Sequence, residues 1–105
     1  MTFQAQKEFA EAVLAIIANS NEGDLLSYGE VARLAHSPNH ARQVGKILAK
    51  LPKDTAIPWF RVVNSKKQIS FTEGSDSYWR QRESLEHEGW RIEGNRILPI
   101  NPPAR

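Results

Sequence analysis

Residues 38 to 51 constrain the fold most, because as a helix they carry two opposed faces, one apolar and one cationic. The apolar stripe is formed by Val44, Ile47, Leu48 and Leu51, and the cationic stripe by Arg42, Lys46, Lys50 and, if the helix reaches it, Lys53. The small residues Pro38, Ala41 and Gly45 lie between the stripes and would let the helix backbone approach another surface closely. Beside a row of cations, we expect that surface to be a DNA groove.

A shorter helix and a turn precede this one. Ser27 and Glu30 have the spacing of a capping box, which predicts a helix that begins there and runs to Ala35. After a turn, we expect Ser37 as the N-cap and Pro38 as the first residue of the second helix. Two helices of this length joined by a short turn indicate a helix-turn-helix.

The run 57–63 combines a proline, a tryptophan and an arginine with apolar residues. Val62-Val63 is β-branched and suits a buried strand, whereas Pro58 cannot donate a ladder hydrogen bond and belongs before the strand. The run therefore predicts a tight turn that presents Trp59. We expect the strand to pair with residues 68–71 in a wing-like hairpin, with the lysines of its turn placed to contact phosphate.

The remaining segments complete a mostly α-helical α/β fold, a single winged helix-turn-helix-like domain over residues 1–105. Before the helix-turn-helix, we expect a helix capped by Thr2 with a core face of Phe9, Val13, Ile16 and Ile17, then an edge strand at Leu25-Leu26. After the wing, we expect a helix over 77–87 capped by Ser75 or Asp76 and ended by Gly89, a hairpin of 90–92 with 96–98, and an extended tail from about 99 to 105.

The charge is distributed unevenly along the chain, although the net charge is only +2. Residues 1 to 30 carry −4, residues 31 to 72 carry +7, and residues 73 to 105 carry −1. Clustered cations release counterions when they neutralise phosphates, so the basic middle of the chain predicts a polyanion-binding surface. Together with the basic helix, this pattern favours nucleic acid as the partner.

The chain contains no cysteine and only three histidines. A disulfide scaffold, thiol redox chemistry, a zinc site and a cofactor are therefore not expected. The first residues lack the basic start and the cleavage site of a signal peptide, and no apolar run approaches the roughly 20 residues of a membrane span. We expect a cytoplasmic protein that associates with the nucleoid when bound to DNA.

From residue 25 to residue 89, four motifs occur in order: LLSYGEVA, HARQVGKIL, IPWFRVV and EHEG. Their order and spacing resemble the DNA-binding and active-site domain of the O6-alkylguanine-DNA alkyltransferases. In that family a cysteine within a Pro-Cys-His-Arg-Val motif accepts the alkyl group, and Trp59 occupies its position here. The chain is thus similar to the alkyltransferase-like proteins, which keep the fold and the lesion pocket but carry tryptophan in place of the nucleophile.

The resemblance implies that the chain is not an enzyme and has no catalytic residue. Alkyl capture needs a thiolate activated by a neighbouring base. Trp59 offers no nucleophile, and Phe60 replaces the family's general-base histidine. Glu88, in EHEG, matches the acid of the family's Cys-His-Glu array, and without its partners we expect a structural role for it.

The resemblance also implies a pocket for a flipped O6-alkylguanine, formed by Tyr28, Trp59, Val62, Phe71 and Thr72. An indole in place of a thiol would add apolar contact to the alkyl group. Near Thr72, some family members carry a basic residue that this chain lacks. Leu51 replaces an asparagine that helps to pin the active-site turn in the family.

Arg42 matches the arginine of the family's RAVG-type motif, here RQVG, which enters the minor groove and fills the gap left by the extruded base. Its planar guanidinium can stack there and hydrogen-bond the orphaned cytosine. Turning a guanine out of the duplex costs about a few kcal/mol, which such contacts would offset. The other DNA-contacting residues implied are Tyr28, Gly29, Ser37, Ala41, Gly45, Lys46, Ser65 and Lys66.

The function implied is a non-catalytic DNA damage sensor that flags O6-alkylguanine in duplex DNA for nucleotide excision repair, through the damage-recognition protein UvrA in bacteria. We expect a monomer. One alternative is a winged-helix transcription regulator without lesion specificity, which predicts base-reading side chains on helix 38–51 and would not need the IPWFRVV turn. The other is a transferase with another nucleophile, for which Ser65 and Lys66 have no identifiable activating partner.

Overall fold

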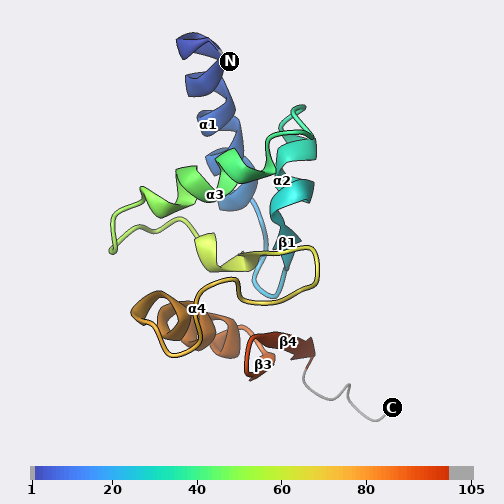
Figure 1. The fold of residues 1–105 in the computed structure, drawn as a ribbon, viewed down its shortest axis with the longest axis vertical. Coiled ribbons are helices and arrows are strands. Elements are labelled where there is room, and N and C mark those ends of the chain that lie inside the picture. Colours follow the sequence, from blue (N-terminus) through green and yellow to red (C-terminus); the bar gives the residue numbers. More distant parts are fainter. Residues whose placement is uncertain (1, 100–105) are drawn as a thin grey trace.

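A computed structural model describes residues 2–99, and Figure 1 shows helices gathered at one end and a helix with a hairpin at the other. The elements, in chain order, are α1 (Phe3–Ala18), β1 (Leu26–Ser27), α2 (Tyr28–Leu34), α3 (Ala41–Ala49), the 3-10 helix η1 (Trp59–Arg61), β2 (Val62–Val63), α4 (Asp76–His87), β3 (Trp90–Glu93) and β4 (Arg96–Pro99). The expected mostly α-helical α/β fold is confirmed. Beyond Pro99, the predicted tail lies outside the described residues.

In the N-terminal half, α1 and the two helices of the helix-turn-helix, α2 and α3, are present, and β1 lies one residue later than the strand expected at Leu25-Leu26. The Thr2 hydroxyl caps α1 by accepting a hydrogen bond from the Ala5 amide at 3.0 Å. Ser27 and Glu30 form the expected capping box at the start of α2. These helices enclose a buried cluster of Phe9, Val13, Ile17, Val31, Ala32, Val44 and Val62.

The predicted start of the second helix is wrong. Ser37 and Pro38 open a turn closed by the hydrogen bond from the His40 amide to the Ser37 carbonyl, at 3.0 Å. Serine and proline suit the first two positions of such a turn as well as a helix start, so the pair fits both structures. α3 therefore begins at Ala41 and ends at Ala49, and Lys53 lies in the following loop.

The two residues of β2 connect the two halves of the molecule. Successive side chains of a strand point to opposite faces, so Val62 joins the N-terminal cluster while Val63 joins a second one. The second cluster consists of Val63, Ile69, Tyr78, Leu85, Ile92 and Ile97. Each cluster thus holds one side of the segment that follows Trp59.

The predicted wing is wrong in its pairing. β2 pairs in parallel with β1, with Leu26 opposite Val62, and not with residues 68–71. The return segment contacts the C-terminal hairpin instead, where Gln68 forms a bridge with Arg96.

The turn after β2 explains this difference. The Asn64 side-chain oxygen accepts hydrogen bonds from the Lys66 and Gln68 amides, each at 3.0 Å. A local side-chain bond of this kind competes with a strand ladder. The Gln68 amide is therefore occupied where a hairpin would use it.

The C-terminal half forms as predicted. Ser75 is the N-cap of α4 and accepts from the Tyr78 amide at 3.2 Å. Gly89 follows the helix with φ +100°, a conformation that favours glycine. β3 and β4 then form an antiparallel hairpin that packs against α4. Within residues 2–99, no helix combines the length and the apolar character that crossing a membrane requires.

Candidate functional site

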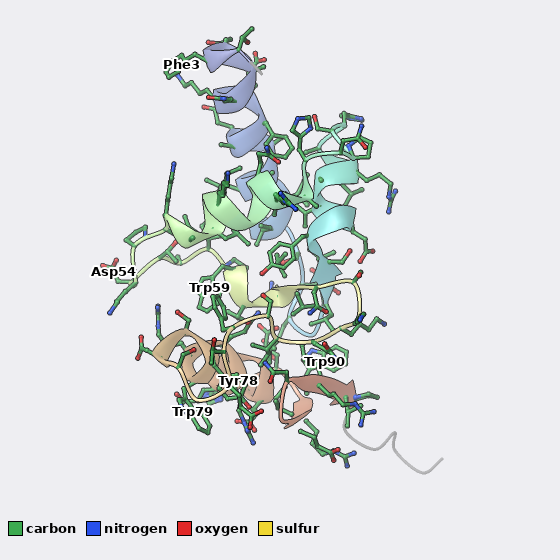
Figure 2. All side chains as sticks on the ribbon, in the orientation of Figure 1. Phe3, Asp54, Trp59, Tyr78, Trp79 and Trp90 are labelled. Carbon is green, nitrogen blue, oxygen red and sulfur yellow. The ribbon has the colours of Figure 1, made fainter. Side chains whose placement is uncertain are left out.

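Trp59 lies in a tight turn built by local backbone bonds, as the sequence predicts. The Trp59 amide donates to the Ile57 carbonyl at 2.7 Å, and the Arg61 amide donates to the Pro58 carbonyl at 3.2 Å. Pro58 precedes the single turn of η1, where its missing amide costs no ladder bond. In Figure 2 the Trp59 side chain lies on the side of η1 that faces α4.

Arg61 anchors this turn through a buried network. Its Nη2 donates to a Glu88 carboxylate oxygen at 2.6 Å, and its Nη1 donates to the Ser20 carbonyl and hydroxyl, each at 2.9 Å. The Gly23 amide donates to the same carboxylate at 3.1 Å. Burial raises the pKa of Glu88, but the hydrogen bonds from Arg61 and Gly23 outweigh it and leave this pKa below its ordinary value.

A hollow of about 200 Å³, which we call the Trp59 pocket, opens between η1, α3 and α4. It is lined by Tyr28, Gly45, Leu48, Ala49, Leu51, Pro52, Trp59, Val62, Phe71, Ser77, Arg80 and Gln81. Four of the five residues expected to form a lesion pocket are therefore brought together. The fifth, Thr72, is exposed and does not line the hollow.

Aromatic contacts shape the pocket wall. The ring centroids of Trp59 and Phe71 lie 6.3 Å apart, edge to face, and those of Trp59 and Phe60 lie 6.2 Å apart in the same arrangement. The Tyr28 hydroxyl, also at the pocket, hydrogen-bonds the Ser70 hydroxyl at 3.2 Å. That bond links the first turn of α2 to the segment that carries Phe71.

Helix α4 supplies three pocket residues that the sequence interpretation missed. Gln81 is buried, and its amide nitrogen donates to the Phe60 and Val62 carbonyls at 3.0 and 3.1 Å. The Arg80 guanidinium lies 5.6 Å from the centre of the Trp59 ring, and Ser77 completes this side. Residues three and four apart share one face of a helix. The spacing of these three residues therefore predicts a common face, but it does not show which segment that face contacts.

The residues expected to contact DNA lie on two helices and in two turns. Arg42 and Lys46 are exposed and four residues apart on α3, so they share a face of that helix. Ala41 is the first residue of α3, Gly29 is exposed in the first turn of α2, and Ser37 lies in the turn between these helices.

The three remaining contact positions are Gly45, Ser65 and Lys66. A Cβ added at Gly45 would lie 3.8 Å from the Tyr28 ring, an ordinary contact, so glycine is not required there for space. Ser65 and Lys66 are exposed in the turn after β2.

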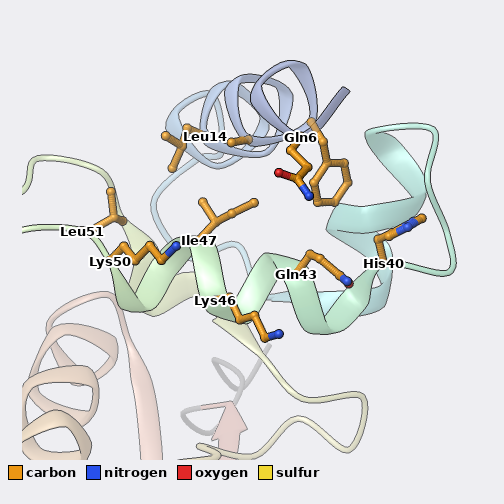
Figure 3. A pocket seen from close by; sticks show the side chains of 10 residues that line it. Gln6, Leu14, His40, Gln43, Lys46, Ile47, Lys50 and Leu51 are labelled. Carbon is orange, nitrogen blue, oxygen red and sulfur yellow. The ribbon is translucent and has the colours of Figure 1, made fainter. Parts of the chain in front are cut away.

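A larger groove, of about 590 Å³, lies on the other side of α3, against α1 (Figure 3). Its walls include Phe9, Leu14 and Ile47 with Lys46 and Lys50. None of the residues expected to form the lesion pocket lines it. The volume of a hollow therefore does not by itself identify the lesion-binding site in this structure.

The Trp59 pocket has no group able to accept an alkyl group as a thiolate would. The chain contains no cysteine. Phe60 carries no proton-transferring atom, and the Glu88 carboxylate is occupied by Arg61. The pocket can enclose a flat ring between aromatic side chains, beside a helix that bears exposed cations.

Fold and site together define a winged helix-turn-helix-like DNA-binding domain. Residues 8–90 match the protein family described as 6-O-methylguanine DNA methyltransferase, DNA binding domain. The chain belongs to this family, which confirms the resemblance found in its motifs.

Two relatives have similar sequences. The DNA base-flipping protein of Escherichia coli (strain K12) is 44% identical over 92 residues, which cover 88% of this chain and 70% of the relative. The alkyltransferase-like protein 1 of Schizosaccharomyces pombe is 39% identical over 85 residues, which cover 81% of this chain and 79% of the relative. The first name describes base flipping, and the second describes a likeness to alkyltransferases.

Solved structures agree with the fold. That of S. pombe Atl1 in complex with damaged DNA containing O6-carboxymethylguanine has a TM-score of 0.80 and 34% identity, and the match covers 91% of this chain and 97% of Atl1. The O6-methylguanine methyltransferase of Mycobacterium tuberculosis has a TM-score of 0.61 and 27% identity, over 84% of this chain and 50% of that enzyme. The fold is thus shared by an alkyltransferase-like protein and a transferase.

Proposed function

We propose that this chain is a non-catalytic DNA damage sensor, which binds duplex DNA, turns an O6-alkylguanine out of the helix and holds it in the Trp59 pocket. The observation that carries the proposal is the grouping of Trp59, Tyr28, Val62 and Phe71 around one hollow. That hollow lies beside a helix-turn-helix whose second helix presents exposed cations. A base that is inspected in such a hollow must leave the duplex stack.

Arg42 would enter the space that the extruded base leaves and stack there through its planar guanidinium. Its position on the exposed face of α3 supports this role. Lys46 and Lys66 would contact phosphates, which position the protein without reading sequence. Gly29, Ser37, Ala41, Gly45 and Ser65 would let the backbone or a hydroxyl group approach the strand, and Thr72 would lie at the mouth of the pocket.

The bound base would remain chemically unchanged. We propose that Trp59 stands where a transferase has its acceptor cysteine and that Phe60 stands where it has its general base. An aromatic ring can cover the O6 substituent and remove its apolar surface from water, at roughly 25 cal/mol per Å². Retention of the lesion would then depend on contact area and not on covalent capture.

A sensor that performs no chemistry requires a separate repair system to remove the lesion that it binds. We propose nucleotide excision repair as that system, with UvrA as the protein that receives the complex, and we propose that the chain acts as a monomeric single domain. A mixture of purified UvrA, the protein and a lesion duplex should elute in size-exclusion chromatography as one complex. Co-elution that is equal with an undamaged duplex would contradict this part of the proposal.

The central proposal is tested by titrating the protein against a short duplex with one O6-methylguanine and against its unmodified twin, at fixed salt. We expect about tenfold tighter binding to the lesion, equivalent to roughly 1.4 kcal/mol. The preference should disappear in Arg42→Ala and persist in Arg91→Ala, a matched change on β3. The methyl group should remain on the recovered DNA. Equal affinity for both duplexes would leave only a general DNA-binding domain.

A further inference from the structure

The Trp59 pocket contains one formally charged side chain, Arg80 of α4, among its lining residues. The Arg80 guanidinium carbon lies 5.6 Å from the centre of the Trp59 ring. Its Nη2 donates to the Lys53 carbonyl at 2.8 Å, in the loop that follows α3. The guanidinium is thus held at the pocket wall by a helix, an indole and a backbone oxygen.

Within residues 2–99, Arg80 takes part in no ion pair. The ion pairs there join Arg61 to Glu88, Arg82 to Glu86, and Arg91 to Glu93. Glu83 and Glu86 share a neighbouring hollow with Arg80 on the outer side of α4, but neither forms a salt bridge with it. Apart from the bond to Lys53, its side-chain donors have no protein acceptor in the described part of the chain.

A half-buried cation without a counter-charge is a costly feature, because it is partly removed from water and gains no pair in return. A neutral alkyl group on guanine would not compensate this cost. A carboxylate would, because guanidinium and carboxylate form short, charge-assisted hydrogen bonds with matching planar geometry. The charge in the pocket therefore favours an anionic ligand.

We propose that Arg80 is a specificity-determining residue that selects O6 substituents ending in a carboxylate. The Trp59 ring would cover the short carbon chain of the adduct. The donors of Arg80 that Lys53 leaves free would bind the carboxylate. This inference rests on the proposed function, since it requires the flipped base to occupy the Trp59 pocket.

The test compares four duplexes that differ at one guanine: unmodified, O6-methyl, O6-carboxymethyl and O6-carbamoylmethyl. The carbamoylmethyl group has nearly the shape of the carboxymethyl group but no charge. We expect the protein to bind the carboxymethyl duplex about tenfold or more tightly than the carbamoylmethyl duplex, as a charge-assisted hydrogen bond implies. Arg80→Gln should bring this ratio close to one, Arg80→Lys should keep part of it, and the remote control Arg91→Gln should keep all of it.

Two results would overturn the inference. The first is a ratio near one in the unaltered protein, and the second is a ratio that survives in Arg80→Gln. If the ratio survives while the affinity for all four duplexes falls uniformly, Arg80 contacts a DNA phosphate instead. A different result would contradict the proposed function itself, namely equal affinity of the unaltered protein for the O6-methyl and unmodified duplexes.

Discussion

Arg61 and Glu88 form a buried ion pair, in which Nη2 and Oε2 lie 2.6 Å apart and each side chain is about 10% exposed. The pair joins the last residue of η1 to the residue that follows α4. Through Ser20 and Gly23 it also joins the loop after α1. The turn that presents Trp59 is therefore held by two other segments, the end of α4 and the loop after α1, and the acid of EHEG has the structural role that the sequence predicts.

Removing one partner should leave a buried charge without its pair. We expect Glu88→Ala to lower the free energy of unfolding by about 3–5 kcal/mol, as when other buried pairs are broken. The matched control is Glu86→Ala, because Glu86 pairs with Arg82 at the surface of α4, and that change should cost less than about 1 kcal/mol. Urea unfolding of both variants measures the difference, and equal losses would contradict the buried role of Glu88.

The same carboxylate should make stability depend on acidity. Because the folded-state pKa of Glu88 is lowered, its contribution is complete above the unfolded pKa and is lost as the pH falls through the folded value. The unfolding midpoint in urea should therefore decline below about pH 4, near the ordinary pKa of glutamate. Glu88→Gln cannot titrate at this position, so its decline between pH 5 and pH 2 should be shallower. A parallel decline in both proteins would assign the effect to other carboxyl groups.

Gln81 supports the floor of the pocket from α4. Its side-chain nitrogen donates to the carbonyls of Phe60 and Val62, which flank Arg61. Gln81→Ala leaves both carbonyls without this donor, and we expect a loss of about 1–3 kcal/mol in unfolding free energy. The preference for the lesion duplex should also fall, because the segment carrying Trp59 is held less firmly. Gln6→Ala, a change on an exposed position of α1, is the control and should alter neither quantity.

Introducing a cysteine at position 59 should not by itself allow an alkyl group to be transferred from guanine to the protein. In Trp59→Cys the new side chain would have no base at position 60, and a thiol without a base is mostly protonated at neutral pH. We expect no methyl group on the protein after incubation with an O6-methylguanine duplex, as measured by intact mass. The comparison is Trp59→Cys combined with Phe60→His, which supplies an imidazole next to the thiol. A methyl mass on the single variant would show that the missing base is not what prevents transfer.

Local patterns predicted most of the fold correctly, because they depend on near neighbours in the chain. The caps at Thr2, Ser27 and Ser75 each need a hydroxyl group and an amide two or three residues away. The predicted start of α3 and the predicted wing were wrong because local interactions at both places stabilise a turn instead of the predicted element. Ser37-Pro38 fits a turn as well as a helix start, and the side chain of Asn64 takes the amide that a hairpin would have used.

Of the residues that the motifs assign to a lesion pocket, Tyr28, Trp59, Val62 and Phe71 line one hollow, and Thr72 lies outside it. They did not identify Ser77, Arg80 and Gln81, because no local pattern links α4 to η1. That contact depends on how the two buried clusters pack on either side of β2.

The sequence by itself determined the helices and their caps, the cationic face of α3, the tight turn at Trp59 and the absence of any thiol. Each of these follows from residue chemistry within about one helical turn of chain. Only the tertiary structure decided that Arg61 pairs with Glu88 and that the guanidinium of Arg80 lies over Trp59, 5.6 Å from its centre. Both contacts join residues more than 20 positions apart, and such contacts form only when the clusters on the two faces of β2 bring η1 and α4 together.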